Sequence, residues 1–315
     1  MKLLHVRRAS TLLVLLLASV VTAACGSDSG GGNTTANQNK TVVIGSAPFA
    51  ESQIVAYMYA GALQNDGYQV SVRKGLGQRE IYLPALQKGG KDNGIDLIPE
   101  YVGTLLEFVN KNAGEASGNL DDSVKKLRDR LDPMGLTALN PAPAADQNAF
   151  AVTKATADKF KLKKLSDLAP VAGQMTLGAG SECPTRPFCQ PGLEKTYGIK
   201  FKAFRALDSG GPKTMEALAS GDIDVGLVFS SDGAVAARNL VVLEDDKKLQ
   251  TVDNLIPAIR KDVVDDTITK TLNKLSAALT TDALIDLNKR ADVDKADPET
   301  LAKEWLQQHG FTKSK

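Results

Sequence analysis

The sequence predicts an α/β protein with two lobes. The chain opens with an apolar strand pattern at 41–45, a helical pattern from about Ala50 and a second strand pattern at 68–72. A strand–helix–strand crossover joins parallel strands, so this opening predicts a parallel sheet. A second observation is a repeated unit, in which a helix ends at Gly89 or Gly221 and a strand containing Ile-Asp follows. Two such units one small domain apart predict two lobes facing a cleft. Repetition of helix, glycine and strand in any α/β protein is the open alternative.

The next strand of the first lobe carries the first candidate binding residues. A buried strand is predicted at 94–98, and Pro99 should end it because proline cannot donate to a ladder. Tyr101 and Thr104 follow directly, before a helical run at 105–109. Ligands of open α/β sheets lie outside the carboxyl ends of the strands. Tyr101 and Thr104 are therefore expected at the ligand site.

The second lobe should begin after the Pro-Ala-Pro segment at 141–143. Apolar runs predict its strands at 150–152, 174–178, 223–229 and 240–243. Helical patterns dominate the final third of the chain, at 265–279, 282–289 and 298–308. We expect these last helices to pack on the first lobe, so that the chain crosses twice between the lobes and forms a hinge.

The first 25 residues form a predicted export signal rather than part of the fold. A basic start, an apolar run at 12–21 and small residues before Cys25 have the pattern of a signal peptide and resemble a bacterial lipobox. Thr22 stands where that pattern usually has leucine. The resemblance implies a lipidated Cys25 that holds the protein at the outer face of the cell membrane. Residues 26–40 would then be a flexible tether.

Cys183 and Cys189 are predicted to form a disulfide, because an exported chain meets an oxidising environment. Closing so short a loop stabilises the fold by only roughly 2 kcal/mol on the chain-entropy model. A zinc site is not expected, since no histidine lies near the pair.

Composition and motifs argue against catalysis. The net charge is +1 with 24% charged residues, so nothing indicates a nucleic-acid partner. The segment 208–212 (Asp-Ser-Gly-Gly-Pro) resembles the nucleophile segment of trypsin-like proteases, but the only histidines are His5 and His309. The same segment approaches a phosphate-binding loop, where Pro212 replaces a required glycine. We therefore expect no catalytic residue, no metal site and no cofactor, and favour a binding protein.

Five segments together resemble one family. Their order and spacing are similar to those of ProX/OpuC-type proteins, the substrate-binding components of ABC importers for osmoprotectants such as glycine betaine, choline and carnitine. The resemblance extends from Thr41 to about Phe311, and the segments that carry it are 49–52, 95–104, 165–168, 230–233 and 242–247.

The resemblance implies a type II periplasmic-binding-protein fold. Lobe one would comprise 41–145 and 245–315, and lobe two 146–244. A small-molecule ligand would be held in the cleft by hinge closure and passed to the membrane permease of an ABC importer.

The resemblance also implies an aromatic cage for a quaternary ammonium group. Tyr101 keeps its cage position, Thr104 keeps its polar contact, and Ser52 falls where relatives use a polar residue near the ligand carboxylate. Phe150 and Phe229 stand where relatives usually have tyrosine, and Asp253 replaces another tyrosine. The carried-over ligand-binding residues are Ser52, Tyr101, Thr104, Phe150, Phe229 and Asp253.

The replaced tyrosines leave the ligand open. Phenylalanine keeps the ring face and loses the hydroxyl, so we expect a weaker grip on glycine betaine and more room for a flatter, hydroxylated or aromatic ligand. An exported enzyme or an adhesion module with the same fold is the remaining alternative class, because fold does not determine function.

The lipid anchor can be tested directly. The variant Cys25→Ser should move the protein from the membrane fraction to the medium or periplasmic fraction, because the acylated side chain is lost. Immunoblotting of separated fractions measures this. Tight membrane association of the variant would contradict lipidation at Cys25.

Overall fold

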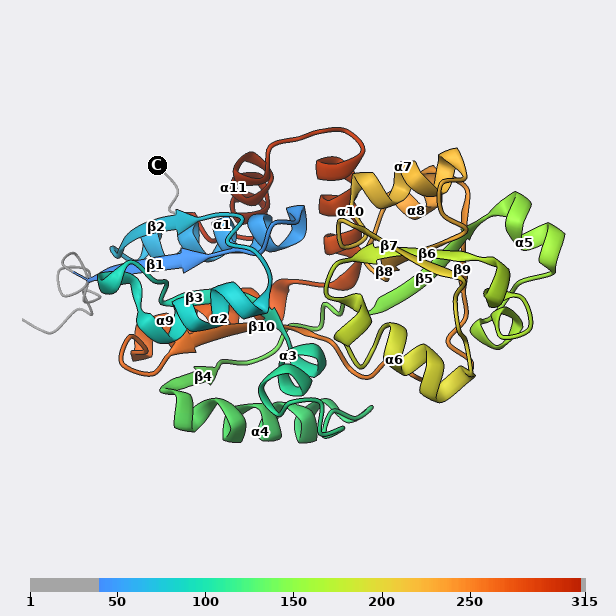
Figure 1. Cartoon of the computed structure of the whole chain (residues 1–315). Helices are drawn as coiled ribbons and strands as arrows, with labels where there is room; N and C mark the ends of the chain where they lie inside the picture. Colours follow the sequence, from blue (N-terminus) through green and yellow to red (C-terminus); the bar gives the residue numbers. More distant parts are fainter. Residues whose placement is uncertain (1–39, 313–315) are drawn as a thin grey trace, which may run out of the picture. The chain divides into compact units, whose positions relative to one another are not determined.

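The structure, a computed structural model, describes residues 40–312, and these fall within one compact unit. It contains two five-stranded sheets, each flanked by helices (Figure 1). The leader, Cys25 and residues 26–39 lie outside the described residues. Within 40–312 no helix is long and apolar enough to span a bilayer.

The first sheet has the strand order β2-β1-β3-β10-β4. β1 pairs in parallel with β2 and β3, which confirms the parallel opening, and β10 is antiparallel to both β3 and β4. The strands are β1 (Thr41–Gly45), β2 (Gln69–Arg73), β3 (Leu97–Tyr101), β4 (Leu136–Ala138) and β10 (Leu255–Arg260).

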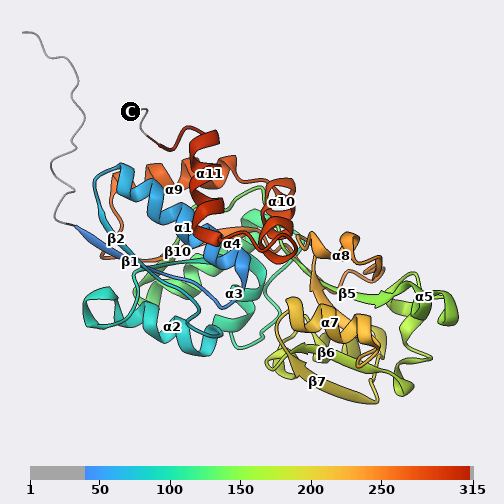
Figure 2. The ribbon, with the colours of Figure 1, turned by 90° about the horizontal axis from the view of Figure 1, so that it is seen from above.

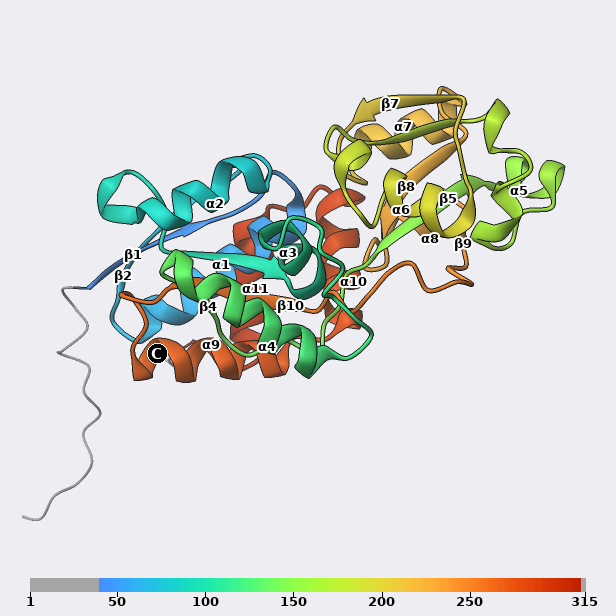
Figure 3. The same ribbon diagram turned by 60° about the horizontal axis from the view of Figure 1, so that its bottom comes forward.

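Helices cover both faces of this sheet. Alternate side chains along each strand therefore pack against one set of helices or the other. Val42 and Ile44 of β1 belong to the apolar cluster of α1, α9, α10 and α11, and Val43 belongs to that of α2, α3 and α4. Figures 2 and 3 show α9 and α11 on one side of the sheet and α2 on the other. The helices are α1 (Ala50–Asn65), α2 (Arg79–Lys88), α3 (Val102–Val109), α4 (Leu120–Leu131), α9 (Asp266–Ala278), α10 (Thr281–Asp292) and α11 (Pro298–Gln308).

The predicted end of β3 at Pro99 is wrong, because the strand continues through Pro99 to Tyr101. Pro99 lies opposite Pro257 of the antiparallel strand β10. The Pro257 carbonyl accepts from the Leu139 N–H, so the backbone groups of Pro257 face away from β3. Opposed residues of this kind exchange no hydrogen bonds, and the missing proline N–H groups leave no partner unsatisfied.

The second sheet has the strand order β7-β6-β8-β5-β9. β6 is parallel to β7 and β8, whereas β5 is antiparallel to β8 and β9. The strands are β5 (Asn148–Thr153), β6 (Thr176–Gly180), β7 (Ala203–Leu207), β8 (Val225–Phe229) and β9 (Leu240–Leu243).

Helices also cover both faces of the second sheet. Phe150 and Leu227 pack in the cluster that includes Leu193, whereas Ala151 and Val228 face Met215 of α7. Figure 1 shows α7 and α8 on one side of this sheet and α6 on the other. The helices are α5 (Lys154–Phe160), α6 (Gln190–Gly192, continued by a π-turn at Leu193–Tyr197), α7 (Pro212–Ser220) and α8 (Ala234–Ala237).

Two linkers join the sheets and run side by side. The chain leaves the first sheet after β4, forms β5 to β9, and returns through residues 244–254 to β10. The Asp146 N–H donates to the Asp253 carbonyl at 3.0 Å, and the Leu255 N–H donates to Ala144 at 2.9 Å. We call the sheet of β1 with its helices lobe one, and the sheet of β5 with its helices lobe two; the paired linkers form the hinge.

Candidate functional site

A pocket lies where both lobes meet the hinge. Lobe one lines it mainly with residues at or after the carboxyl ends of β1, β2 and β3, and lobe two mainly with residues after β6 and β7 and within β8, as expected for α/β sheets. The lining comprises Phe49, Gln78, Arg79, Tyr82, Tyr101, Thr104, Phe108 and Asn112 from lobe one, Asp146 and Asp253 from the linkers, and Asn148, Glu182, Cys183, Arg186, Pro187, Phe188, Cys189, Ser209, Leu227 and Phe229 from lobe two.

Three rings form a row across the two lobes. The Phe49 ring centroid lies 6.4 Å from that of Tyr101 and 6.2 Å from that of Phe229, with an interplanar angle of 31° in each pair. The Tyr101 hydroxyl donates to Glu51 Oε1 at 2.6 Å, so it is turned into the protein. The three rings line the pocket together, and aromatic rings attract cations.

A buried ion pair supports the polar side of the pocket. The Arg79 guanidinium donates to both carboxylate oxygens of Glu100, at 2.7 to 3.2 Å, and the Tyr82 hydroxyl also donates to Glu100, at 2.7 Å. Arg79 also donates to Thr104 Oγ1 at 2.7 Å, which orients that hydroxyl. Because Arg79 forms an ion pair with Glu100, the charge of this arginine is largely compensated within the protein.

Asp253 binds the first turn of α3. Its Oδ1 accepts from the Gly103 and Thr104 N–H groups, at 2.9 and 3.0 Å. Gly103 permits this approach, because a Cβ there would collide with the carbonyl oxygen of Val252. Burial raises the pKa of Asp253 to about 7, although the Thr104 N–H and Arg79 oppose the shift. Asp253 is therefore a titratable group on the pocket wall near neutral pH.

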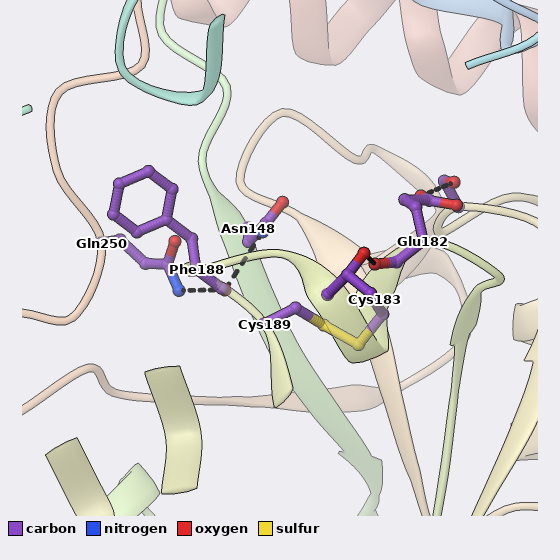
Figure 4. Close-up of a disulfide and its surroundings, with 8 residues drawn as sticks. Asn148, Glu182, Cys183, Phe188, Cys189 and Gln250 are labelled. Atoms are coloured by element: carbon purple, nitrogen blue, oxygen red, sulfur yellow. Dashed lines mark hydrogen bonds between the residues drawn. A yellow bond between two sulfur atoms is a disulfide. The ribbon is translucent and has the colours of Figure 1, made fainter. Parts of the chain in front are cut away.

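The predicted disulfide shapes one wall of the pocket. Cys183 and Cys189 are bonded, and the Phe188 carbonyl inside their loop accepts from Asn148 and Gln250, at 3.2 and 3.0 Å (Figure 4). Arg186 of the same loop reaches lobe one, where it forms a 3.0 Å ion pair with Glu80. Its guanidinium also lies 4.8 Å from the centroid of the Phe108 ring. The loop thus bridges the pocket from lobe two to lobe one.

The structure brings four of the six predicted ligand-binding residues together. Tyr101, Thr104, Phe229 and Asp253 all line the pocket. Ser52 does not: it is 1% exposed, and its hydroxyl accepts from the Ala47 N–H at 2.9 Å. Ser52 therefore secures the turn before α1.

Phe150 also lies outside this pocket lining. It is 1% exposed and packs in the core of lobe two. Asn148, two residues earlier on β5, lines the pocket instead. Since a strand advances about 3.3 Å per residue, Phe150 lies roughly 7 Å further from the rim.

Several lining residues were missed by sequence reasoning. Phe49 had a usable signal, because it follows β1 at the same edge of the sheet as Tyr101. Arg79, Tyr82 and Phe108 lie on helices, and no local pattern indicates which face of a helix borders a cleft. Two segments of the family resemblance, 165–168 and 242–247, stabilise the fold rather than line the pocket. They are joined by the Ser166 hydroxyl, which donates to Asp246 at 2.6 Å.

Among residues 40–312, no group of three or more histidine, cysteine or carboxylate side chains could hold a metal ion.

Known proteins are similar to this chain over most of its length. The family model described as the substrate binding domain of the ABC-type glycine betaine transport system (OpuAC) matches residues 40–308. The glycine betaine-binding protein YehZ of Escherichia coli K12 is 27% identical over 284 residues, covering 86% of this chain and 92% of that protein. The carnitine transport binding protein OpuCC of Listeria monocytogenes is 29% identical over 291 residues, covering 87% and 89%.

A solved structure is similar over the same range. A crystal structure of a glycine betaine/carnitine/choline ABC transporter protein superimposes with a TM-score of 0.67 at 28% identity, covering 86% of this chain and 99% of that one. The expected two-lobed periplasmic-binding-protein fold is confirmed by this match and by the two α/β sheets.

The disulfide can be tested by its removal. The double variant Cys183→Ser/Cys189→Ser should stay folded and lose about 2 kcal/mol of unfolding free energy, the chain-entropy value for so short a loop. Urea unfolding measures this, with the unreduced wild type as reference. Mass spectrometry without reductant should show the two cysteines joined, and two freely alkylated thiols in the native protein would contradict the bond.

The protonation of Asp253 predicts a pH-dependent stability. Between the ordinary aspartate pKa of about 3.9 and the raised value, the folded chain holds a proton that the unfolded chain has lost, so the unfolding free energy falls as pH rises. Asp253→Asn keeps the acceptor oxygen and removes the charge. The variant should be more stable than wild type at pH 8, by as much as about 4 kcal/mol, and the difference should vanish toward pH 4.

Asp265→Asn is the matched control, because Asp265 also accepts a backbone hydrogen bond at a helix start, from Ile268. Although burial opposes it, the Ile268 N–H and Lys40 hold the pKa of Asp265 below its ordinary value. This variant should therefore be less stable than wild type at pH 8. Urea unfolding at several pH values measures both effects, and an Asp253→Asn variant less stable than wild type at pH 8 would contradict the assignment.

Proposed function

Because the chain belongs to the family of substrate-binding domains of ABC-type glycine betaine transport systems, we propose that it captures a quaternary-ammonium osmoprotectant such as glycine betaine in the interlobe pocket. It would then deliver that ligand to the permease of an ABC importer. The observation that carries the proposal is the row Phe49, Tyr101 and Phe229, which draws rings from both lobes. Catalysis is not part of this role, since the relatives are transport binding proteins.

The ring row suits a group that cannot hydrogen-bond. A quaternary ammonium has no N–H to donate, so a protein holds it by ring faces and by carboxylates. Each cation–π contact contributes roughly 0.5 to 2 kcal/mol, more when the contact is desolvated. Because Phe229 comes from lobe two and the other two rings from lobe one, closure around the ligand would add contacts that the open form lacks.

The charge of the pocket supports a cationic head group. Glu182 and Asp253 line it, and among the described residues neither forms an ion pair with lysine or arginine. The two lining arginines are paired elsewhere: Arg79 with the buried Glu100, and Arg186 with Glu80, whose side chain is 52% exposed. Arg186 has the more exposed partner and is the better candidate to bind a ligand carboxylate.

A second candidate ligand is flatter and carries hydroxyl or aromatic groups. The observation that favours it is the rest of the lining, which contains the rings of Tyr82, Phe108 and Phe188 and the amides of Asn112 and Asn148. Rings with nearby amides can hold a planar polar ligand by stacking and hydrogen bonds. With either ligand, the protein would be exported and held at the outer face of the membrane by a lipid attached to Cys25.

Calorimetric titration with glycine betaine, carnitine and choline tests the function. At least one should bind, and Tyr101→Ala should weaken it tenfold or more, about 1.4 kcal/mol, because a ring face is lost. Tyr101→Phe should bind within a few-fold of wild type. Tyr57→Ala, on α1 outside the pocket lining, is the control and should not alter affinity.

The outcomes separate the two ligands. Failure of all three quaternary amines, together with binding of a hydroxylated aromatic compound, would replace the first candidate by the second. Binding of any ligand that Tyr101→Ala leaves unchanged would contradict the assignment of the pocket.

A further inference from the structure

A buried chain of hydrogen bonds connects the lobes behind the ring row. Glu51 lies in the first turn of α1 in lobe one, Ser231 follows β8 of lobe two, and Asp146 belongs to the first linker. The Ser231 hydroxyl oxygen lies 2.7 Å from Glu51 Oε2 and 2.7 Å from Asp146 Oδ1. All three residues are buried, with no more than 6% of their surface exposed. We call them the interlobe chain.

The number of protons does not match two ionised carboxylates. A serine hydroxyl has one hydrogen and can donate to only one acceptor. If Glu51 and Asp146 were both ionised, one of the two 2.7 Å contacts would bring an anionic oxygen against a hydroxyl oxygen with no proton between them. A proton on one carboxyl group removes the conflict, because that group then donates to Ser231 while Ser231 donates to the other.

The hydrogen-bond donors around the interlobe chain identify the protonated group as Asp146. Glu51 accepts at both oxygens, from the Tyr101 hydroxyl at 2.6 Å and from Asn288 Nδ2 at 2.6 Å, as an ionised carboxylate does. Apart from the shared hydroxyl, Asp146 accepts only the Ser231 N–H, at 3.0 Å. Burial, and then the negative charge of Glu51, raise the pKa of Asp146 well above its ordinary value.

The charged groups around the interlobe chain also favour a proton within it. Asp253 on the second linker adds negative charge beside Asp146. Asp232, in the loop of Ser231, and Asp292 on α10 lie near Glu51, and burial raises the pKa of Asp232 to about 6. Lys289 of α10 packs against Gly233 but is exposed, and no described lysine or arginine forms an ion pair with Glu51 or Asp146. Burial also raises the pKa of Tyr101, which therefore stays neutral.

We infer that Asp146 holds a proton in this arrangement of the lobes and donates it to Ser231, which donates to Glu51, so that closing the lobes takes up one proton. Glu51 is thereby a positioning residue, since it holds the Tyr101 hydroxyl with one oxygen and lobe two with the other. Moving lobe two away would separate Ser231 from Glu51 and let water reach Asp146.

The direction of the pH effect follows from this uptake. In the open form the pKa of Asp146 returns toward the ordinary aspartate value of about 3.9. Between that value and the raised one, the closed form holds one proton more than the open form. The ratio of closed to open molecules therefore falls up to tenfold for each unit by which pH rises. Acid pH favours closure, and alkaline pH favours opening and exchange of ligand.

Small-angle X-ray scattering on the ligand-free chain 26–315 between pH 5 and 9 tests the inference without any knowledge of the ligand. The radius of gyration of the wild type should increase with pH. Asp146→Asn, which is neutral at every pH, should remove that dependence above pH 7. Ser231→Ala should also show no pH dependence and should have the larger radius throughout, because the link between the lobes is lost.

Asp232→Asn is the matched control, since it neutralises the neighbouring carboxylate outside the chain and should keep the wild-type increase above pH 7. Circular dichroism at each pH verifies that every variant is folded. A wild-type radius that stays constant over the range would overturn the inference. So would an Asp146→Asn variant that expands with pH as the wild type does.

Discussion

The pairing of the two linkers is the constraint on which the rest of the binding site depends. The hydrogen bonds from Asp146 to Asp253 and from Leu255 to Ala144 place the crossing segments antiparallel and in register. This register delivers one carboxylate from each linker to the pocket. It also keeps the lobes joined by two short segments, the usual structure of a hinge, in which a few residues absorb the rotation while the sheets stay rigid.

Carboxylates dominate the buried polar groups near the hinge, and each has a distinct source of stabilisation. Glu100 has Arg79, Glu51 has two strong donors, and Asp253 has backbone N–H groups at the start of α3. Burying a charge without partners is costly, so a carboxyl group with fewer donors keeps its proton instead. The cleft is therefore sensitive to pH.

Most regular elements followed from local patterns, but β4, β7, β10, α4 and α5 did not, and two of these have a clear physical cause. β10 was missed because Pro257 interrupts an otherwise apolar run, and a proline inside a run argues against a strand. α4 was missed because its helix is mostly polar, with an apolar stripe at Val124, Leu127 and Leu131 that only packing completes. The partners of β10, β3 and β4, lie far away in sequence, whereas α4 packs on its sequence neighbours α3 and β4.

The sequence by itself determined the α/β class, the parallel pairing of the first strands, the cysteine pair and the family. Each of these follows from short-range periodicity or from motifs in a fixed order. It also indicated Tyr101, Thr104, Phe229 and Asp253, which the fold brings to one pocket. Only the tertiary structure decided that Phe150 and Ser52 turn into the protein, and that Glu51 and Ser231, 180 positions apart in sequence, share a proton path with Asp146. Depth along a strand and contact between lobes depend on three-dimensional packing, which no local pattern records.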